Sequence, residues 1–168
     1  MNAFRISSRR AALAIQATAG LFMVLATTIG APHPAEARGK SFYLTPGSYE
    51  GDAALKACAS GFHMASLWEI RDTSTLQYNV RLGLTRGDSG SGPPTGEWGW
   101  IRTGSGSSTY GNLGVPNCAA WTTNQGDPHY GTLASLSEEW DVPSSPIVPW
   151  MAAQISCDHA VHVWCVRQ

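Results

Sequence analysis

The sequence predicts an α+β domain with two N-terminal helices packed on short antiparallel sheets, long irregular loops and two disulfides. Helix signals are concentrated before residue 85, whereas aromatic and β-branched runs typical of strands occur near residue 42 and again at the C-terminal end. The chain between them is rich in glycine, serine and proline, which is typical of loops. All four cysteines lie after the N-terminal leader.

The first 37 residues have the features of a cleaved secretory signal peptide. A basic start leads into a weakly apolar stretch, residues 11–31, and Ala35-Glu36-Ala37 is a small-x-small cleavage site. The threonines of this stretch and its Pro-His-Pro tail disfavour the alternative, a membrane anchor. We expect cleavage before Arg38, by the general secretory route or, given Arg9-Arg10, the twin-arginine route. The sequence therefore predicts a secreted or periplasmic protein.

The part after the leader, residues 38–168, is expected to form a single domain. Its 131 residues are enough for one domain with a core. Three of the 11 basic and one of the 12 acidic residues lie in the leader, so the remainder has a net charge near −3. A weak and mixed charge favours neither nucleic acid nor an anionic membrane as partner. We expect no membrane span after signal cleavage.

The first elements after the leader are a strand and a helix. The aromatic pair Phe42-Tyr43 indicates a strand that stops at Pro46-Gly47. Asp52 is a suitable N-cap for a helix that would carry Cys58 and end at Gly61.

A second helix is expected to begin at Leu67. Ser66 and Glu69 have the spacing of a capping box, in which each side chain satisfies a backbone N–H of the first turn. A further helical piece is expected to run through Leu76 and Val80.

The rest of the chain is expected to be mostly irregular, with three short strands. Within residues 85–112 the run "EWGWI" indicates a strand with Trp98 and Trp100 on one face. Prolines make the long segment up to residue 150 unsuited to regular structure. Residues 151–156 and 160–166 are expected to be the closing strands.

The four cysteines of an exported chain predict two disulfides. A bridge from Cys157 to Cys165 is disfavoured, because the residues between them include no glycine, proline or asparagine on which the chain could turn back. Two pairings remain: nested, with Cys58–Cys165 and Cys118–Cys157, or crossed, with Cys58–Cys157 and Cys118–Cys165.

A metal site near the C-terminus is disfavoured. The cysteines lack chelate spacing and form no C-x-x-C redox pair. His159 and His162 are three residues apart, and the β-branched and aromatic neighbours of His162 favour a strand, in which the two side chains would point to opposite faces. We expect no metal and no cofactor.

The arrangement of cysteines and tryptophans resembles the C-type lectin-like fold. The segments that carry the resemblance are, in order, Phe42-Tyr43, the helix with Cys58, "GFHMASL", "EWGWI", "NCAAWTT" and the final "VWCVRQ". The chain is most similar to bacterial secreted domains of the endostatin-like branch, which often show C-x-x-W-T-[ST] and end on such a strand. The resemblance covers residues 41–168, and it implies the nested disulfide pairing.

The chain departs from the calcium-binding motifs of sugar-binding C-type lectins. Those proteins use Glu-Pro-Asn or Gln-Pro-Asp and a Trp-Asn-Asp stretch. The nearest strings here are Val115-Pro116-Asn117 and Trp140-Asp141-Val142, which lack the carboxylate of the first motif and the asparagine of the second. Because calcium needs several oxygen ligands, we expect ligand binding without calcium.

These observations predict a secreted, disulfide-stabilised, non-catalytic binding or adhesion module for an unknown extracellular ligand, either glycan or protein. Irregular loops carry recognition in such a fold, whereas Trp68, Trp121 and Trp164 are expected in the core. The candidate ligand-binding residues are Trp98, Trp100, Asn117, Asn124, Asp127 and Tyr130.

Two alternatives remain. A secreted hydrolase would need His129 or His159 to meet a carboxylate such as Asp127 or Asp158 in a cleft, although the sequence has no nucleophile motif. Adhesion through Arg86-Gly87-Asp88, the integrin-recognition tripeptide, is the other.

Overall fold

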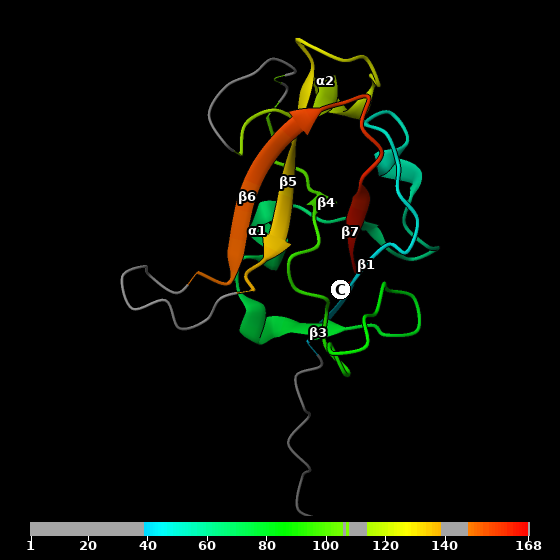
Figure 1. Cartoon of the computed structure of the whole chain (residues 1–168), viewed down its shortest axis with the longest axis vertical. Helices are drawn as coiled ribbons and strands as arrows, with labels where there is room; N and C mark the ends of the chain where they lie inside the picture. The colour runs from blue at the N-terminus through cyan, green and yellow to red at the C-terminus, as the bar shows by residue number, and fades with distance from the viewer. Residues whose placement is uncertain (1–38, 106, 108–113, 139–147, 168) are drawn as a thin grey trace, which may run out of the picture. The chain divides into compact units, whose positions relative to one another are not determined.

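The computed structural model describes residues 39–105, 107, 114–138 and 148–167, which form a mixed α/β fold on one seven-stranded sheet with few helical turns (Figure 1). Residues 36–168 make up one compact unit. The predicted leader lies outside the described residues, as does the Trp140-Asp141-Val142 string.

The C-terminal strand β7 occupies the middle of the sheet. It pairs antiparallel with β1 on one side, and on the other side antiparallel with β2 and parallel with β4. The sheet order is β3-β1-β7-β4-β5-β6, with β2 on β7. The strands are β1 (Lys40–Leu44), β2 (His63–Met64), β3 (Leu76–Tyr78), β4 (Gly99–Trp100), β5 (Tyr130–Leu136), β6 (Trp150–Ser156) and β7 (His162–Arg167).

The first predicted helix is wrong. The chain forms only a 3₁₀ turn, η1 (Ala54–Lys56), and Cys58 follows it in a loop. Leu55 is 45 % exposed, whereas Ala54 is buried. A helix this short depends on packing of an apolar face, which Leu55 does not supply here. The prediction of two N-terminal helices is therefore wrong.

The second helix begins where the capping box predicts. Helix α1 (Leu67–Ile70) follows Ser66, whose backbone N–H and hydroxyl both donate to the carboxylate of Glu69, at 2.9 and 2.7 Å. It comprises a single turn of four residues.

The further helical piece expected through Leu76 and Val80 is also wrong. A 3₁₀ turn, η2 (Thr73–Thr75), is followed directly by β3. The Asp72 carboxylate accepts the N–H of Ser74 at 3.1 Å, a local bond that competes with continued helix. Leu76 then pairs with β1, so sheet pairing takes the place of helix.

Strand β5 was not expected, whereas both closing strands were. Every residue of β5 after Tyr130 is buried, because β5 lies between β4 and β6. A strand in this position loses the alternation of apolar and polar residues by which strands are recognised, and its glycine and serines resemble loop.

Two tryptophans form the centre of the core. Trp100 and Trp164 are fully buried. The indole N–H of Trp100 donates to the carbonyl of Tyr49 at 2.7 Å, and that of Trp164 donates to Ala134 at 2.8 Å. Both rings are thus buried with their polar atom satisfied, as a stable core requires.

The disulfides are nested. Cys58–Cys165 ties the loop after η1 to β7, and Cys118–Cys157 ties a turn near residue 120 to the end of β6. No cysteine is free. Of the two pairings that the sequence left open, the crossed one is excluded in this structure.

The two disulfides are expected to differ modestly in their effect on stability. They close loops of 107 and 39 residues. In the chain-entropy account, replacing Cys58 and Cys165 by alanine lowers the free energy of unfolding by about 5 kcal/mol, and replacing Cys118 and Cys157 lowers it by about 4 kcal/mol. Urea denaturation of the parent and both double variants measures this. A double variant within about 1 kcal/mol of the parent contradicts the account.

Candidate functional site

Trp68 is the most exposed large hydrophobic side chain among the described residues. It is the second residue of α1, and 73 % of its surface is exposed. The prediction that Trp68 belongs to the core is therefore wrong. Ile70, two residues on, is 1 % exposed, and side chains two apart on a helix point to nearly opposite sides. The helical spacing of these two residues was the signal that could have identified Trp68.

A series of backbone hydrogen bonds leads from the central strand to this tryptophan. The N–H of Ala65 donates to the carbonyl of Trp164 at 2.7 Å, and the N–H of Arg102 donates to Ala65 at 2.9 Å. The N–H of Leu67 in turn donates to Arg102 at 3.0 Å. The backbone of β7 thereby places Arg102 beside Leu67, the first residue of α1, and Trp68 is the next residue.

Two concavities share Trp68 as a wall, and each has a volume of about 450 Å³, within the range of ligand sites. We call them the Arg102 cleft and the Trp150 cleft. The described residues of the Arg102 cleft are Leu55, Ser66, Trp68, Arg102, Gly104, Ser105, Asn117, Ala120 and Trp121. Those of the Trp150 cleft are Leu67, Trp68, Ile70, Arg71, Thr103, Gly114 and Trp150.

Arg102 is held by a carboxylate that has other partners. Its Nη2 lies 3.5 Å from Oε2 of Glu69, which also accepts from Ser66, while Oε1 of Glu69 lies 2.6 Å from Nε2 of His63. Burial alone would raise the pKa of Glu69, but the hydrogen bonds from Ser66 and His63 outweigh it and lower the pKa to about 2. Glu69 is thus ionised and well satisfied, and it leaves much of the guanidinium of Arg102 uncommitted.

Two buried donors at the Arg102 cleft have no acceptor among the described residues. The indole N–H of Trp121 is unpaired although the residue is only 5 % exposed, and the Nε–H of Arg102 is unpaired as well. Buried donors are nearly always satisfied, because an unmade hydrogen bond costs about 1–3 kcal/mol. Both residues line the Arg102 cleft.

A left-handed turn supplies one wall of this cleft. The segment labelled α2 (Cys118–Trp121) has positive φ at all four residues, between 52° and 64°. None is glycine, and each such residue costs about 1–2 kcal/mol. Asn117 caps the turn by accepting the N–H of Ala120 at 3.0 Å, and the disulfide Cys118–Cys157 anchors its start. This turn places Ala120 and Trp121 in the cleft wall.

Two lining residues of the Trp150 cleft, Trp150 and Ile70, are joined by a hydrogen bond. The indole N–H of Trp150 donates to the carbonyl of Ile70 at 2.8 Å. The guanidinium carbon of Arg71 lies 6.0 Å from the ring centroid of Trp68, at the outer limit of a cation–π contact. This cleft therefore combines apolar walls with one cation.

The candidate residues taken from the sequence are not brought together. Trp100 is fully buried, so it belongs to the core and is not available for ligand contact, and Trp98 is partly buried against the same core. Asn117 is 5 % exposed and borders the Arg102 cleft. The amide of Asn124 donates to Glu50 at 2.9 Å. Asp127 accepts a bond from Tyr130 at 3.4 Å, and none of these last three residues borders either cleft.

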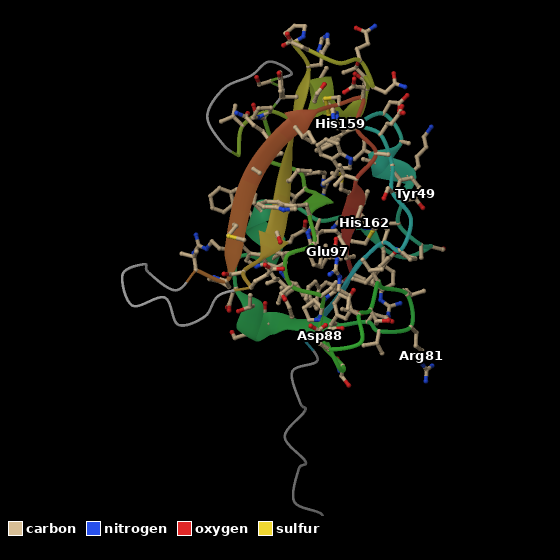
Figure 2. The ribbon with its side chains drawn as sticks, in the orientation of Figure 1. Tyr49, Arg81, Asp88, Glu97, His159 and His162 are labelled. Atoms are coloured by element: carbon tan, nitrogen blue, oxygen red, sulfur yellow. A yellow bond between two sulfur atoms is a disulfide. The ribbon has the colours of Figure 1, made fainter. Side chains whose placement is uncertain are left out.

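His129 and His159, the histidines that the hydrolase alternative needs, do not form an arrangement for hydrolysis. Nδ1 of His159 lies 2.9 Å from Oδ1 of Asp158, and the Ser156 hydroxyl donates to the same oxygen at 2.6 Å. A nucleophilic triad needs the imidazole between hydroxyl and carboxylate, whereas here the carboxylate is in the middle. The pair is exposed, and Figure 2 shows His159 away from His162. The ring of His129 makes no hydrogen bond to a described carboxylate, and its buried Nδ1 is unpaired.

The Arg86-Gly87-Asp88 segment is partly engaged within the molecule. The guanidinium of Arg86 forms an ion pair with Glu97, and the Ser89 hydroxyl donates to the carbonyl of Arg86 at 3.0 Å. Asp88 lies at the end of the molecule opposite His159 in Figure 2. Adhesion through this segment stays a prediction.

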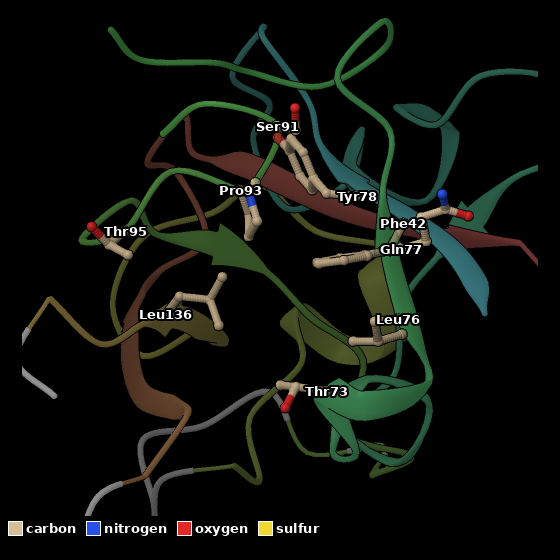
Figure 3. Close-up of a pocket in the computed structure, with 10 residues that line it drawn as sticks. Phe42, Thr73, Leu76, Gln77, Tyr78, Ser91, Pro93, Thr95 and Leu136 are labelled. Atoms are coloured by element: carbon tan, nitrogen blue, oxygen red, sulfur yellow. The ribbon is translucent and has the colours of Figure 1, made fainter. Parts of the chain in front are cut away.

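A further cavity of about 500 Å³ lies between β3 and the loop around Pro93 (Figure 3). Its described walls are largely apolar, with Phe42, Tyr78 and Leu136 among them, and they include no charged side chain. It therefore does not indicate the chemistry of a ligand.

Within the described ranges, no group of three or more His, Cys, Asp or Glu side chains is arranged to hold a metal ion. The same ranges contain no helix that is long and apolar enough to cross a bilayer. Comparison with protein-family models, with curated proteins and with solved structures found no match.

Glycine in the left-handed turn is expected to stabilise the protein. Ala119→Gly removes the steric cost of a Cβ at φ 52° and raises the free energy of unfolding by up to about 1 kcal/mol. The matched control is Ala57→Gly, where φ is −70° and where glycine is expected to destabilise by about 0.5–1 kcal/mol. Thermal and urea unfolding measure both variants. Equal destabilisation by the two substitutions contradicts the strain assigned to this turn.

Glu69 is expected to make stability depend on acid pH. Its pKa in the folded protein is about 2, below the ordinary 4.5, so its contribution is complete above about pH 4.5 and disappears as the pH falls towards 2. Glu69→Gln should lower the free energy of unfolding by about 2 kcal/mol at pH 6. The gap between parent and variant should narrow below about pH 4. Urea unfolding across this range tests it, and a gap independent of pH contradicts it.

Proposed function

We propose that the chain is a secreted, non-catalytic binding module of C-type lectin-like type that binds an extracellular ligand at the two clefts around Trp68, without calcium. The observation that carries the proposal is the exposure of Trp68 between two cavities of ligand size. A large exposed aromatic side chain with cavities beside it is typical of an interaction site rather than of an inert surface.

The assignment to the C-type lectin-like fold is supported by the covalent framework. The nested bridges Cys58–Cys165 and Cys118–Cys157 are those that the resemblance implies. The first and last strands, β1 and β7, pair with each other, which brings the two ends of the domain together. Of the three tryptophans expected in the core, Trp121 and Trp164 are buried and Trp68 is exposed.

The binding function is supported by features of the site that lower the stability of the fold. Unpaired donors in the Arg102 cleft and four left-handed residues in its wall each lower stability. Such features cluster at functional sites, because a ligand or a required geometry compensates for them.

Binding without calcium and without catalysis is supported by residue chemistry. The Val115-Pro116-Asn117 string lacks the carboxylate that a calcium-binding lectin supplies, and the Pro116 carbonyl already accepts the hydroxyl of Thr132 at 2.8 Å. Neither cleft has a histidine among its described residues. A general base for hydrolysis would have to come from elsewhere.

The test is an array of glycans and extracellular matrix proteins probed with the exported chain, with and without EDTA. We expect binding that EDTA leaves unchanged and that Trp68→Ala reduces at least about tenfold, as is usual for a central aromatic anchor. Trp68→Phe keeps a ring and should retain part of the binding. Val80→Ala, at an apolar side chain that is 42 % exposed and borders neither cleft, is the control. Binding that EDTA abolishes, or that Trp68→Ala leaves intact, contradicts the proposal.

A further inference from the structure

We infer that the ligand of the Trp68 clefts is an extended acidic peptide, which places an apolar side chain in the Trp150 cleft and a carboxylate in the Arg102 cleft. This inference rests on the proposed binding function and names the chemistry of its ligand. It follows from the different linings of the two clefts, which share one indole ring.

The charges that line the clefts are positive. Arg102 is the charged residue described in one cleft and Arg71 in the other, and no carboxylate is among the described lining residues of either. Glu69 contacts Arg102 only between its Oε2 and Nη2 of the guanidinium, at 3.5 Å, and it accepts shorter hydrogen bonds from Ser66. A guanidinium has five N–H donors, so most of those of Arg102 remain for a ligand carboxylate.

The unpaired donors specify an acceptor in the same cleft. The indole N–H of Trp121 and the Nε–H of Arg102 can only donate, and neither has a partner in the part of the chain that the structure describes. Both residues line the Arg102 cleft, and a ligand carboxylate offers two acceptor oxygens. The hydroxyl of Ser105 and the amide of Asn117 also lie in the lining, whereas the hydroxyl of Ser66 there already donates to Glu69. This half of the site thus suits an anionic, oxygen-rich group.

The other half suits an apolar side chain. The Trp150 cleft is lined by Leu67, Ile70 and the rings of Trp68 and Trp150. Its hydroxyl, on Thr103, already donates to the carbonyl of Val115 at 3.1 Å, and the indole N–H of Trp150 is also engaged. A sugar would leave most of its hydroxyls unpaired there, which costs binding energy. The lining therefore favours a peptide over an acidic glycan.

The spacing of the two clefts fits an extended backbone. Trp68 lines both clefts, and groups that pack against opposite faces of one ring are about 7–8 Å apart, two van der Waals contacts of about 3.5–4 Å each. Side chains two residues apart on an extended chain lie on the same face, about 7 Å apart. An apolar residue and an acidic residue separated by one position match both clefts.

The experiment uses the exported chain and two pools of capped hexapeptides. In each pool one position is fixed as Leu, Phe or Trp, and the position two residues away is fixed as Asp in one pool and Asn in the other. Oligosaccharides of uronic acid and of neutral sugars form the third and fourth arms. Binding is measured by fluorescence anisotropy at low and high NaCl.

We expect the Asp pool to bind at least about tenfold more tightly than the Asn pool at low salt, because the carboxylate pairs with a partly buried guanidinium. The difference should shrink at high NaCl. Arg102→Gln should remove the difference, and Arg102→Lys should keep part of it. Arg81→Gln, which neutralises an exposed arginine bordering neither cleft, should change nothing.

Each contrary result overturns a different part of the proposal. Equal binding of the Asp and Asn pools, or a difference that Arg102→Gln and Arg102→Lys both leave unchanged, overturns the acidic component. Trp68-dependent binding of uronic acid oligosaccharides without peptide binding overturns the peptide class but leaves the proposed function standing. No Trp68-dependent binding in any arm overturns this inference, and if the matrix-protein array also shows none, the proposed function fails with it. Near-ultraviolet circular dichroism confirms that each variant is folded.

Discussion

The burial of β7 between strands on both sides is the constraint on which the rest of the structure depends. Val163 to Val166 are all fully buried, and this short run pairs with β1, β2 and β4. It also carries Trp164, at the centre of the core, and Cys165, which is bound to Cys58. Hydrophobic burial, sheet hydrogen bonding and a covalent bridge therefore act on the same four residues.

The candidate site depends on this strand through the backbone. From Trp164 the hydrogen bonds run by way of Ala65 and Arg102 to Leu67, and Trp68 follows. The opposite wall is supplied independently by the left-handed turn, which the disulfide at Cys118 holds. Two segments, one held by backbone hydrogen bonds and the other by a disulfide, thus meet at one cleft, and rigid walls reduce the entropy that a ligand would lose on binding.

The sequence predicts those elements that depend on local side-chain chemistry or on a strongly apolar run. The capping box at Ser66 places the start of α1, and the apolar, β-branched end of the chain predicts β7. The sequence fails where tertiary pairing overrides local preference. Leu76 joins β1 instead of extending a helix, and β5 is buried on both faces, so its small residues give no periodic signal. The site was missed because a tryptophan in an apolar segment is usually in the core, whereas Trp68 lies on the side of α1 nearly opposite the buried Ile70.

The central claim is that Trp68 is an exposed ring beside a cleft in which Trp121 holds an unsatisfied donor. The most direct measurement is the ¹⁵N–¹H spectrum of the tryptophan indole groups, recorded with and without the aspartate-containing peptide pool. The account predicts fast solvent exchange at Trp68 and slow exchange at Trp121. It also predicts that peptide moves the Trp121 resonance downfield as its N–H gains an acceptor, while the satisfied indoles of Trp100 and Trp164 stay in place. Slow exchange at Trp68, or peptide that shifts Trp100 and Trp164 and leaves Trp121 unmoved, would contradict it.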